Sequence, residues 1–396
     1  MIVLWLAAGA LAGSFLSTWI AAFVCLPKSA ASDADHWTIR ARQVYPLWVL
    51  LAVAPIFLPL VIWMMLVLEA NAGASLVHSL VVCFSSWAGI SIAASAIESR
   101  VRGRRISVAS WWRGWSVSLL FFLPHIAIFT LMAAGLSARI DPSTLMLMGF
   151  AVSLAVVMFC GGSLIVARAI GLLRAPSDRL RSIVRTAAER TGTSPNQIYE
   201  LRWKSANAFA FPIAQAIAVS ERALEDLTED ELISVCVHEL AHLRESWAVK
   251  LGRMIGHLAL VPLFLVVPLL EEFGIAAVIF IVSCVFMALR FPQWLAYRME
   301  LRADAQALEK QGDDGTYARA LAKLYESNLM PAVMRQKHLT HPHLYDRLLA
   351  AKVTPDYPRP GPPSGWRQFF GVTVLLLTAC ATSIGWRFLM RLIPGP

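Results

Sequence analysis

Charged residues are scarce in this chain. Of its 396 residues, 15% are Asp, Glu, Lys or Arg, whereas 57% are hydrophobic. Soluble domains carry about 25% charged residues, so this composition excludes an ordinary soluble globular protein. It predicts instead a protein with several membrane spans. The net charge of +9 comes from arginines beside the apolar runs, where we expect them to contact lipid headgroups.

The chain also lacks three patterns that would indicate other classes of protein. It has no internal repeat and no stripe in which basic and aromatic residues alternate, so we expect no nucleic-acid partner. Its cysteines have no paired spacing and lie almost entirely in apolar stretches, which argues against disulfides and cysteine metal ligands. These residues are Cys25, Cys83, Cys160, Cys236, Cys284 and Cys380.

Eight apolar runs approach the length of about 20 residues that a membrane-spanning helix needs. The sixth and seventh are short, and Pro262 and Pro268 interrupt the sixth. The first has no charged amino-terminal region and no clear small-x-small cleavage site before Lys28, so we interpret it as a retained helix. The runs lie at about 3–26, 46–68, 75–97, 115–137, 143–172, 254–270, 273–290 and 366–390.

The most informative local pattern is His-Glu-Leu-Ala-His at residues 238–242. On a helix, positions i and i+4 share one face, so His238 and His242 can bind one metal ion with Glu239 beside them. Upstream, Thr228 and Glu231 have the spacing of a capping box, which would start this helix and give the histidines a rigid support. The alternative is a helix whose histidines only pair with nearby carboxylates.

A pair of acidic residues, Glu300 and Asp304, has the same i, i+4 spacing. Catalytic zinc needs three protein ligands and one position for water, so Glu300 is the expected third ligand. Asp304, one turn later, would accept the remaining ring N–H of a ligating histidine. The alternative is a solvated helix face on which both acids pair with Arg298 and Arg302.

Residues 341–347 add candidates for a further role. His341, His343 and Arg347 could each donate a hydrogen bond to the oxyanion of a tetrahedral intermediate at the metal. The same residues are also typical of a His-Pro turn followed by a helix with a surface arginine.

A small soluble segment is predicted between the fifth apolar run and the His-Glu motif. Ser177 would cap a helix at 180–190 that Gly192 ends. Strands are expected at 198–203 and 209–219, and such a sheet would offer an edge to which an extended peptide could add.

Taken together, these segments resemble the integral-membrane zinc metallopeptidases that include bacterial HtpX and the CAAX prenyl-protein endopeptidases. The resemblance covers roughly residues 175–350. It implies that His238, His242 and Glu300 bind one Zn²⁺ ion per chain and that Glu239 is the catalytic base.

The resemblance also implies a substrate-binding strand. In that family the segment matching Asn207, Ala208, Phe209 and Ala210 is an edge strand beside the substrate backbone. Two departures stand out in this chain. Residues 211–212 are Phe-Pro, where the family usually has a small residue or glycine. After the second histidine, residues 244–246 are Arg-Glu-Ser, where the family more often has Asn or His together with Asp.

The charge pattern predicts which side of the membrane carries these segments. His238 and Glu300 must meet at one ion, so the chain between them crosses the membrane an even number of times. Arginines fill the connections after the third and fifth apolar runs, whereas the connections near 69–73, 139–141 and 271–272 hold almost none. We therefore expect a multi-pass protein, of a bacterial inner membrane, with these segments facing the cytoplasm. The arginines are Arg100, Arg102, Arg104, Arg105, Arg113, Arg174, Arg179, Arg181 and Arg185.

The expected fold class is mainly α: a polytopic helical membrane protein with a gluzincin-like cytoplasmic metallopeptidase domain that carries a small β-sheet. The expected domains are transmembrane helices at 1–173, with about five spans, and the metallopeptidase domain at 174–350, with a membrane hairpin at about 254–290. A Pro-rich linker at 351–365 and a last transmembrane helix at 366–396 follow.

The expected function is zinc-dependent cleavage of peptide bonds in membrane or membrane-associated proteins, for quality control or processing. The expected partners are thus a peptide or protein substrate and the lipid bilayer. Two alternatives stay open. A signalling receptor protease that makes one regulatory cut would be favoured by an extracellular sensor domain, and the outer loops are short. A non-catalytic membrane scaffold would be favoured by a lost ligand or base, and all four positions are filled.

Overall fold

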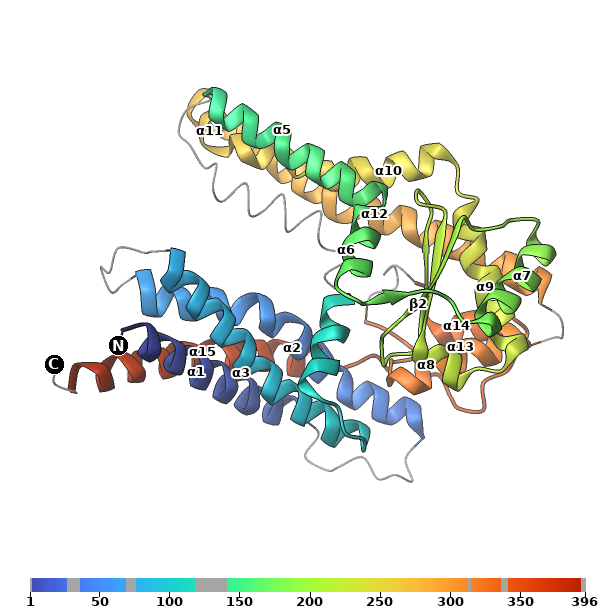
Figure 1. Cartoon of the computed structure of the whole chain (residues 1–396), viewed down its shortest axis with the longest axis horizontal. Helices are drawn as coiled ribbons and strands as arrows, with labels where there is room; N and C mark the ends of the chain where they lie inside the picture. Colours follow the sequence, from blue (N-terminus) through green and yellow to red (C-terminus); the bar gives the residue numbers. More distant parts are fainter. Residues whose placement is uncertain are drawn as a thin grey trace. The chain divides into compact units, whose positions relative to one another are not determined.

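The computed structural model describes residues 2–26, 36–68, 76–117, 141–311, 315–335 and 341–392 (Figure 1). Most of these residues are helical, and six helices are long and apolar enough to cross a membrane. One mixed sheet of four strands is present among them. The expected mainly α fold with several membrane-length helices and a small β-sheet is therefore confirmed. Contacts divide the chain into two compact units, Met1–Trp115 with Leu329–Arg335 and Arg359–Pro396, and Ser116–Asn328 with Gln336–Pro358.

The first unit is a bundle of long apolar helices. Its helices α1, α2, α3 and α15 pack against one another, and residues 108–117 are helical as well. Small residues allow the close approach: a Cβ at Gly89 of α3 would overlap the carbonyl oxygen of Leu11 in α1. The bounds are α1 (Ile2–Cys25), α2 (Trp37–Trp63), the π-helical turn η1 (Met64–Leu68), α3 (Leu76–Arg102) and α15 (Gly365–Leu392).

Of the eight predicted spans, seven fall on described residues, and six of these coincide with long apolar helices. The run at 115–137 lies almost entirely outside the described residues. Residues 254–270, the predicted span that two prolines interrupt, do not form one continuous helix. The chain there forms α10 (Trp247–Leu258), a 3₁₀ turn η3 (Val261–Leu265) and α11 (Val266–Phe273). Prolines 262 and 268 lack the N–H that a continuous helix needs.

The run at 273–290 proves to be only the first half of a much longer helix. Helix α12 (Ile275–Lys310) has 36 residues and continues from the apolar run to the acidic pair. The fifth run is α5 (Pro142–Val157), which passes through a π-helical turn η2 (Met158–Gly162) into α6 (Ser163–Ala169).

The sheet lies in the second unit and has the strand order β1-β2-β4-β3. Strand β2 (Gln197–Leu201) runs parallel to β4 (Ala216–Ser220). The edge strands β1 (Leu173–Arg174) and β3 (Ala208–Phe211) are antiparallel to their neighbours.

The single strand predicted at 209–219 is wrong, because a turn divides it into β3 and β4. Pro212 has no N–H for the ladder, and Gln215 has a positive φ of 49°. The Gln215 side chain donates to the Pro212 carbonyl and stabilises the turn.

Helix α9 (Glu229–Leu243) forms the core of the second unit. It begins at the predicted capping box, in which Thr228 accepts from the Glu231 N–H and the Glu231 carboxylate accepts from the Thr228 N–H. Helices α7, α12 and α13 and strands β3 and β4 pack around it, so most of its side chains are buried. The other helices are α7 (Asp178–Thr191), α8 (Glu221–Asp226), α13 (Thr316–Asn328) and α14 (Leu344–Ala350).

Candidate metal centre

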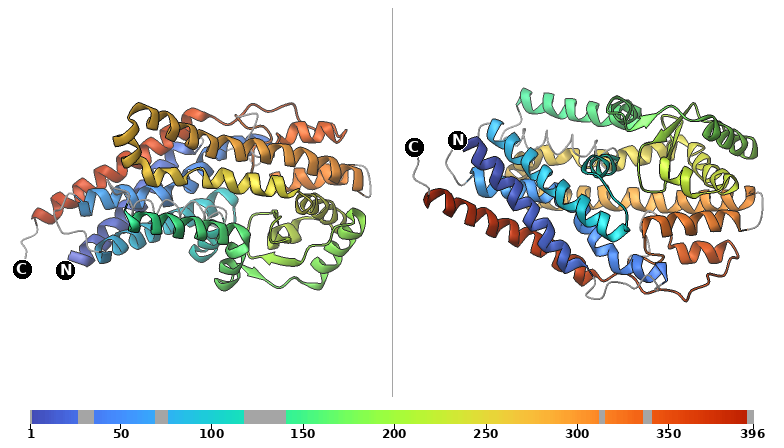
Figure 2. Two further views of the ribbon diagram at one scale, coloured as in Figure 1. Left: turned by 90° about the horizontal axis from the view of Figure 1, so that it is seen from above. Right: turned by 60° about the horizontal axis from the view of Figure 1, so that its bottom comes forward.

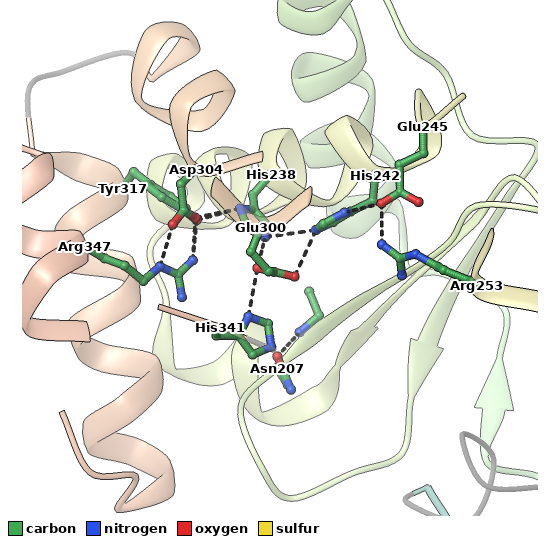
Figure 3. A network of polar contacts seen from close by, with 11 residues as sticks. Asn207, His238, His242, Glu245, Arg253, Glu300, Asp304, Tyr317, His341 and Arg347 are labelled. Carbon is green, nitrogen blue, oxygen red and sulfur yellow. Dashed lines mark hydrogen bonds and ion pairs between the residues drawn. The ribbon is translucent and has the colours of Figure 1, made fainter. Parts of the chain in front are cut away.

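Helices α9 and α12 bring three predicted metal ligands together (Figure 3). The Nε2 atoms of His238 and His242 lie 3.3 Å apart. The Glu300 carboxylate faces both rings, with Oε2 at 3.3 Å from His238 Nε2 and Oε1 at 3.4 Å from His242 Nε2. All three side chains are buried.

This geometry fits a zinc ion. Ligands placed tetrahedrally at roughly 2.0–2.1 Å from zinc lie about 3.3–3.4 Å from one another, as these three groups do. Glu300 Oε2 is also a buried oxygen without a well-aligned hydrogen bond, although His341 Nδ1 lies 2.8 Å from it. The two Nε2 atoms and the Glu300 carboxylate oxygens, all of which carry lone pairs, thus surround one point, where a cation would stabilise them.

The second ring nitrogen of His238 is held by a buried polar network. Its Nδ1 lies 3.2 Å from Asp304 Oδ1 and 2.7 Å from the hydroxyl of Tyr317. Tyr317 donates to Asp304 at 2.7 Å, and Arg347 donates to both Asp304 oxygens at 2.8 and 2.6 Å. The Nδ1–H therefore has acceptors, which leaves the Nε2 lone pair for a metal.

His242 has an equivalent partner on a different element. Its Nδ1 lies 2.9 Å from Oε1 of Glu245, in the turn after α9, and Arg253 of α10 donates to the same oxygen at 2.6 Å. Among the described residues, Glu245 Oε2 and Arg253 Nε have no hydrogen-bond partner. Each histidine is thus oriented by a carboxylate that an arginine holds in place.

The acidic surroundings favour positive charge at this point. Burial by itself lowers the pKa of both histidines. Hydrogen bonds to Asp304 and Glu300 nevertheless raise the pKa of His238 to about 9. Hydrogen bonds to Glu245 and Glu300 raise the pKa of His242 to about 10. A cation at the shared Nε2 position would take the place of these protons.

The remaining predicted residues lie in three different settings. Glu239 is half-buried, and its charge acts on both histidines. His341 is 53% exposed and reaches the ligand group through Glu300. Arg347 is buried and donates to Asp304 and to the Tyr317 hydroxyl. His343 is buried as the residue that precedes α14.

The predicted substrate strand lies at the edge of the sheet, beside α9. Residues 208–211 form β3, which pairs with β4 in the sheet. Asn207 lies just before it, and its side-chain oxygen accepts from the Ala208 N–H. Figure 3 shows Asn207 in the same view as His341 and Glu300.

Sequence reasoning missed Glu245, Arg253 and Tyr317. Glu245 had a signal, because it follows His242 by three residues, a spacing that a side chain can bridge at a helix end. Arg253 and Tyr317 had none, because they come from α10 and α13 and meet the histidines only after the chain has folded.

The family comparison covers the segment that holds this site. Residues 174–354 match peptidase family M48. Among solved structures, the crystal structure of S. mikatae Ste24p matches with a TM-score of 0.48 and 15% identity, and the match covers 90% of this chain and 99% of that chain. The comparison with curated proteins gives no match. Residues 174–354, which carry the His-Glu motif and all three predicted ligands, are thus similar to peptidase family M48, in a chain with six helices long and apolar enough to cross a membrane among its described residues.

Proposed function

We propose that this protein is a zinc-dependent endopeptidase that cleaves membrane or membrane-associated proteins at the cytoplasmic face. The observation that carries the proposal is the buried triangle of His238, His242 and Glu300, whose spacing matches tetrahedral zinc. We assign one Zn²⁺ to it. When bound, zinc acts as a Lewis acid and lowers the pKa of water.

The protein's own residues supply the proton transfers. Glu239 lies between the two histidines in the sequence and is half-buried at the site, so it can accept a proton from the attacking water. The same carboxylate then passes the proton to the leaving amine. His341, which is exposed beside Glu300, donates to the developing oxyanion. Arg347 supports this chemistry indirectly, by holding Asp304 against His238.

Strand β3 is the proposed binding site for the substrate backbone. An extended peptide can add to the edge of a sheet through main-chain hydrogen bonds. The segment Asn207, Ala208, Phe209 and Ala210 would present that edge, because β3 is the last strand in the order β1-β2-β4-β3 and packs beside α9.

The cytoplasmic orientation rests on charge. The chain leaves the site through α10 and returns through α12, so both ends of this hairpin lie on one side of the membrane. Arginines follow α3 and α6, and the far end of the hairpin carries Glu271 and Glu272. Reaction of single engineered cysteines with an impermeant maleimide on intact cells tests this orientation.

The test of function is the substitution Glu239→Gln. We expect the purified variant to keep its zinc, measured by elemental analysis, and to lose at least about a hundredfold in peptide cleavage. Cleavage is followed on a membrane-protein preparation by mass spectrometry of new amino termini. Glu229→Gln, an exposed acid at the start of the same helix, is the matched control. Unchanged turnover by Glu239→Gln would remove that residue from the base role.

A further inference from the structure

Helices α10 and α12 leave the proposed active site side by side and run in opposite directions (Figure 2). Gly252 of α10 marks where the two helices touch, because a Cβ there would lie 3.3 Å from the side chain of Leu295 and 3.5 Å from that of Phe291, both in α12. Because the helices are antiparallel, Trp247, five residues before Gly252 in α10, lies near the level of Arg298 of α12. The start of α10 and the second half of α12 are thus both next to the metal ligands.

The two halves of α12 present different surfaces. The half nearer Gly274 exposes large apolar side chains on the face opposite the buried Ala277 and Cys284, among them Ile279, Val282 and Phe286. A surface of this kind suits lipid chains rather than water. The other half exposes charged side chains, among them Arg302, Glu309 and Lys310, and its inner face carries the buried acids of the metal centre.

A belt of aromatic and basic residues separates these halves. Trp247 is 73% exposed, and the buried Lys250 places its Nζ 5.3 Å from the centre of the Trp247 ring. Trp294 is 51% exposed, with the Arg298 guanidinium 4.7 Å from its ring. Arg290, four residues before Trp294, is exposed as well. Tryptophan and arginine together are typical of the headgroup layer, in which the ring lies at the boundary and the cation contacts phosphate.

We propose that this belt lies in the headgroup layer of a bilayer that contains anionic phospholipids, and that it fixes the height of the metal ligands above the membrane. The belt consists of the exposed residues Trp247, Arg290, Trp294 and Arg298. From Gly274 to Trp294, α12 rises roughly 30 Å, which equals the thickness of the hydrocarbon core. Arg290 reaches outward along its own stem to the phosphates.

The height follows from the helix. Six residues separate Trp294 from Glu300, so the ligand lies about 9 Å from the belt along α12. A tilt of the helix only reduces this height. An extended peptide covers roughly 3.3 Å per residue, so about three residues beyond a membrane span suffice to reach the ligands. Resting on the proposed function, the inference names the substrate class: peptide bonds directly beside a membrane span.

The first experiment measures depth and needs no activity. Single spin labels are placed at the exposed positions 279, 286, 294 and 301 in a full-length background without other cysteines, reconstituted in vesicles of phosphatidylcholine with and without phosphatidylglycerol. We expect oxygen to relax the labels at 279 and 286 most, a nickel chelate to reach 301, and 294 to be intermediate. The proposal would be overturned if the nickel chelate relaxed the label at 294 as strongly as the label at 301. It would also be overturned if neither reagent reached the label at 294, because protein and not lipid would then cover it.

The second experiment measures reach. The probe is a synthetic peptide with an apolar span and a tail of one repeated motif, so that sequence preference cannot select the cut. We expect cuts as close as the third to sixth tail residue, and at least about tenfold slower cleavage of the same tail without its span. If all cuts lay beyond the sixth tail residue, the inferred height of the metal ligands above the membrane would be refuted. If neither probe is cut while the labels show the expected depths, the proposed function fails and the belt stands.

Discussion

Removal of the Glu245 charge should weaken zinc binding although Glu245 is not a ligand. In Glu245→Gln the side chain keeps its size, but it loses the carboxylate that accepts from His242 Nδ1 at 2.9 Å and from Arg253 at 2.6 Å. His242 then loses the anion that orients its ring, and Arg253 loses its counter-ion.

The expected magnitude follows from this geometry. Loss of an outer partner of a ligating histidine lowers metal affinity about 10–100-fold, which corresponds to about 1.4–2.8 kcal/mol. The contact is buried, so solvent does not screen it strongly. We therefore place Glu245→Gln in the upper part of this range. Arg253→Met should have a smaller effect, because Glu245 still faces His242.

The assay is competition for zinc with a chelator of known affinity, with the full-length protein in detergent. The double variant Glu245→Gln/Arg253→Met should lose less affinity than the sum of the single losses, because the two residues form one unit. Glu229→Gln, an exposed acid on the same helix, serves as the control. An affinity for Glu245→Gln within about twofold of the wild type would refute the reasoning.

Three further predictions address stability and the rest of the site. Tyr317→Phe removes the hydroxyl shared by the first histidine and Asp304, so we expect a loss of about 1–3 kcal/mol in unfolding free energy and a lower kcat/KM, measured by thermal unfolding and peptide cleavage. Gly89→Ala places a methyl group on a backbone oxygen of α1 and should cost about 1–3 kcal/mol or more by thermal unfolding, whereas Gly149→Ala, in open space, should be neutral. Burial raises the pKa of Glu231, but hydrogen bonds from a lysine and from the capping residue hold it below its usual 4.5. The resulting stability is present above pH 4.5 and is lost as the pH falls through the lower folded-state pKa, so unfolding curves of Glu231→Gln and wild type should differ near neutrality and converge in acid.

The sequence by itself determined the features that depend on local spacing. The composition and the apolar runs predicted the helical membrane protein, and the capping pattern at Thr228 and Glu231 predicted where α9 begins. Residues four apart on a helix necessarily share a face, so the pairing of His238 with His242 followed from the sequence as well. Asp304 could be assigned to a ligating histidine for the same reason, although the sequence did not say which one.

Only the tertiary structure decided what lies around these residues. The turn that divides β3 from β4 depends on a positive φ at Gln215. Glu245 links His242 Nδ1 to Arg253, and Arg347 donates to Asp304. These contacts join helices that are distant in the chain. Their formation depends on packing around α9, which no local spacing in the sequence encodes.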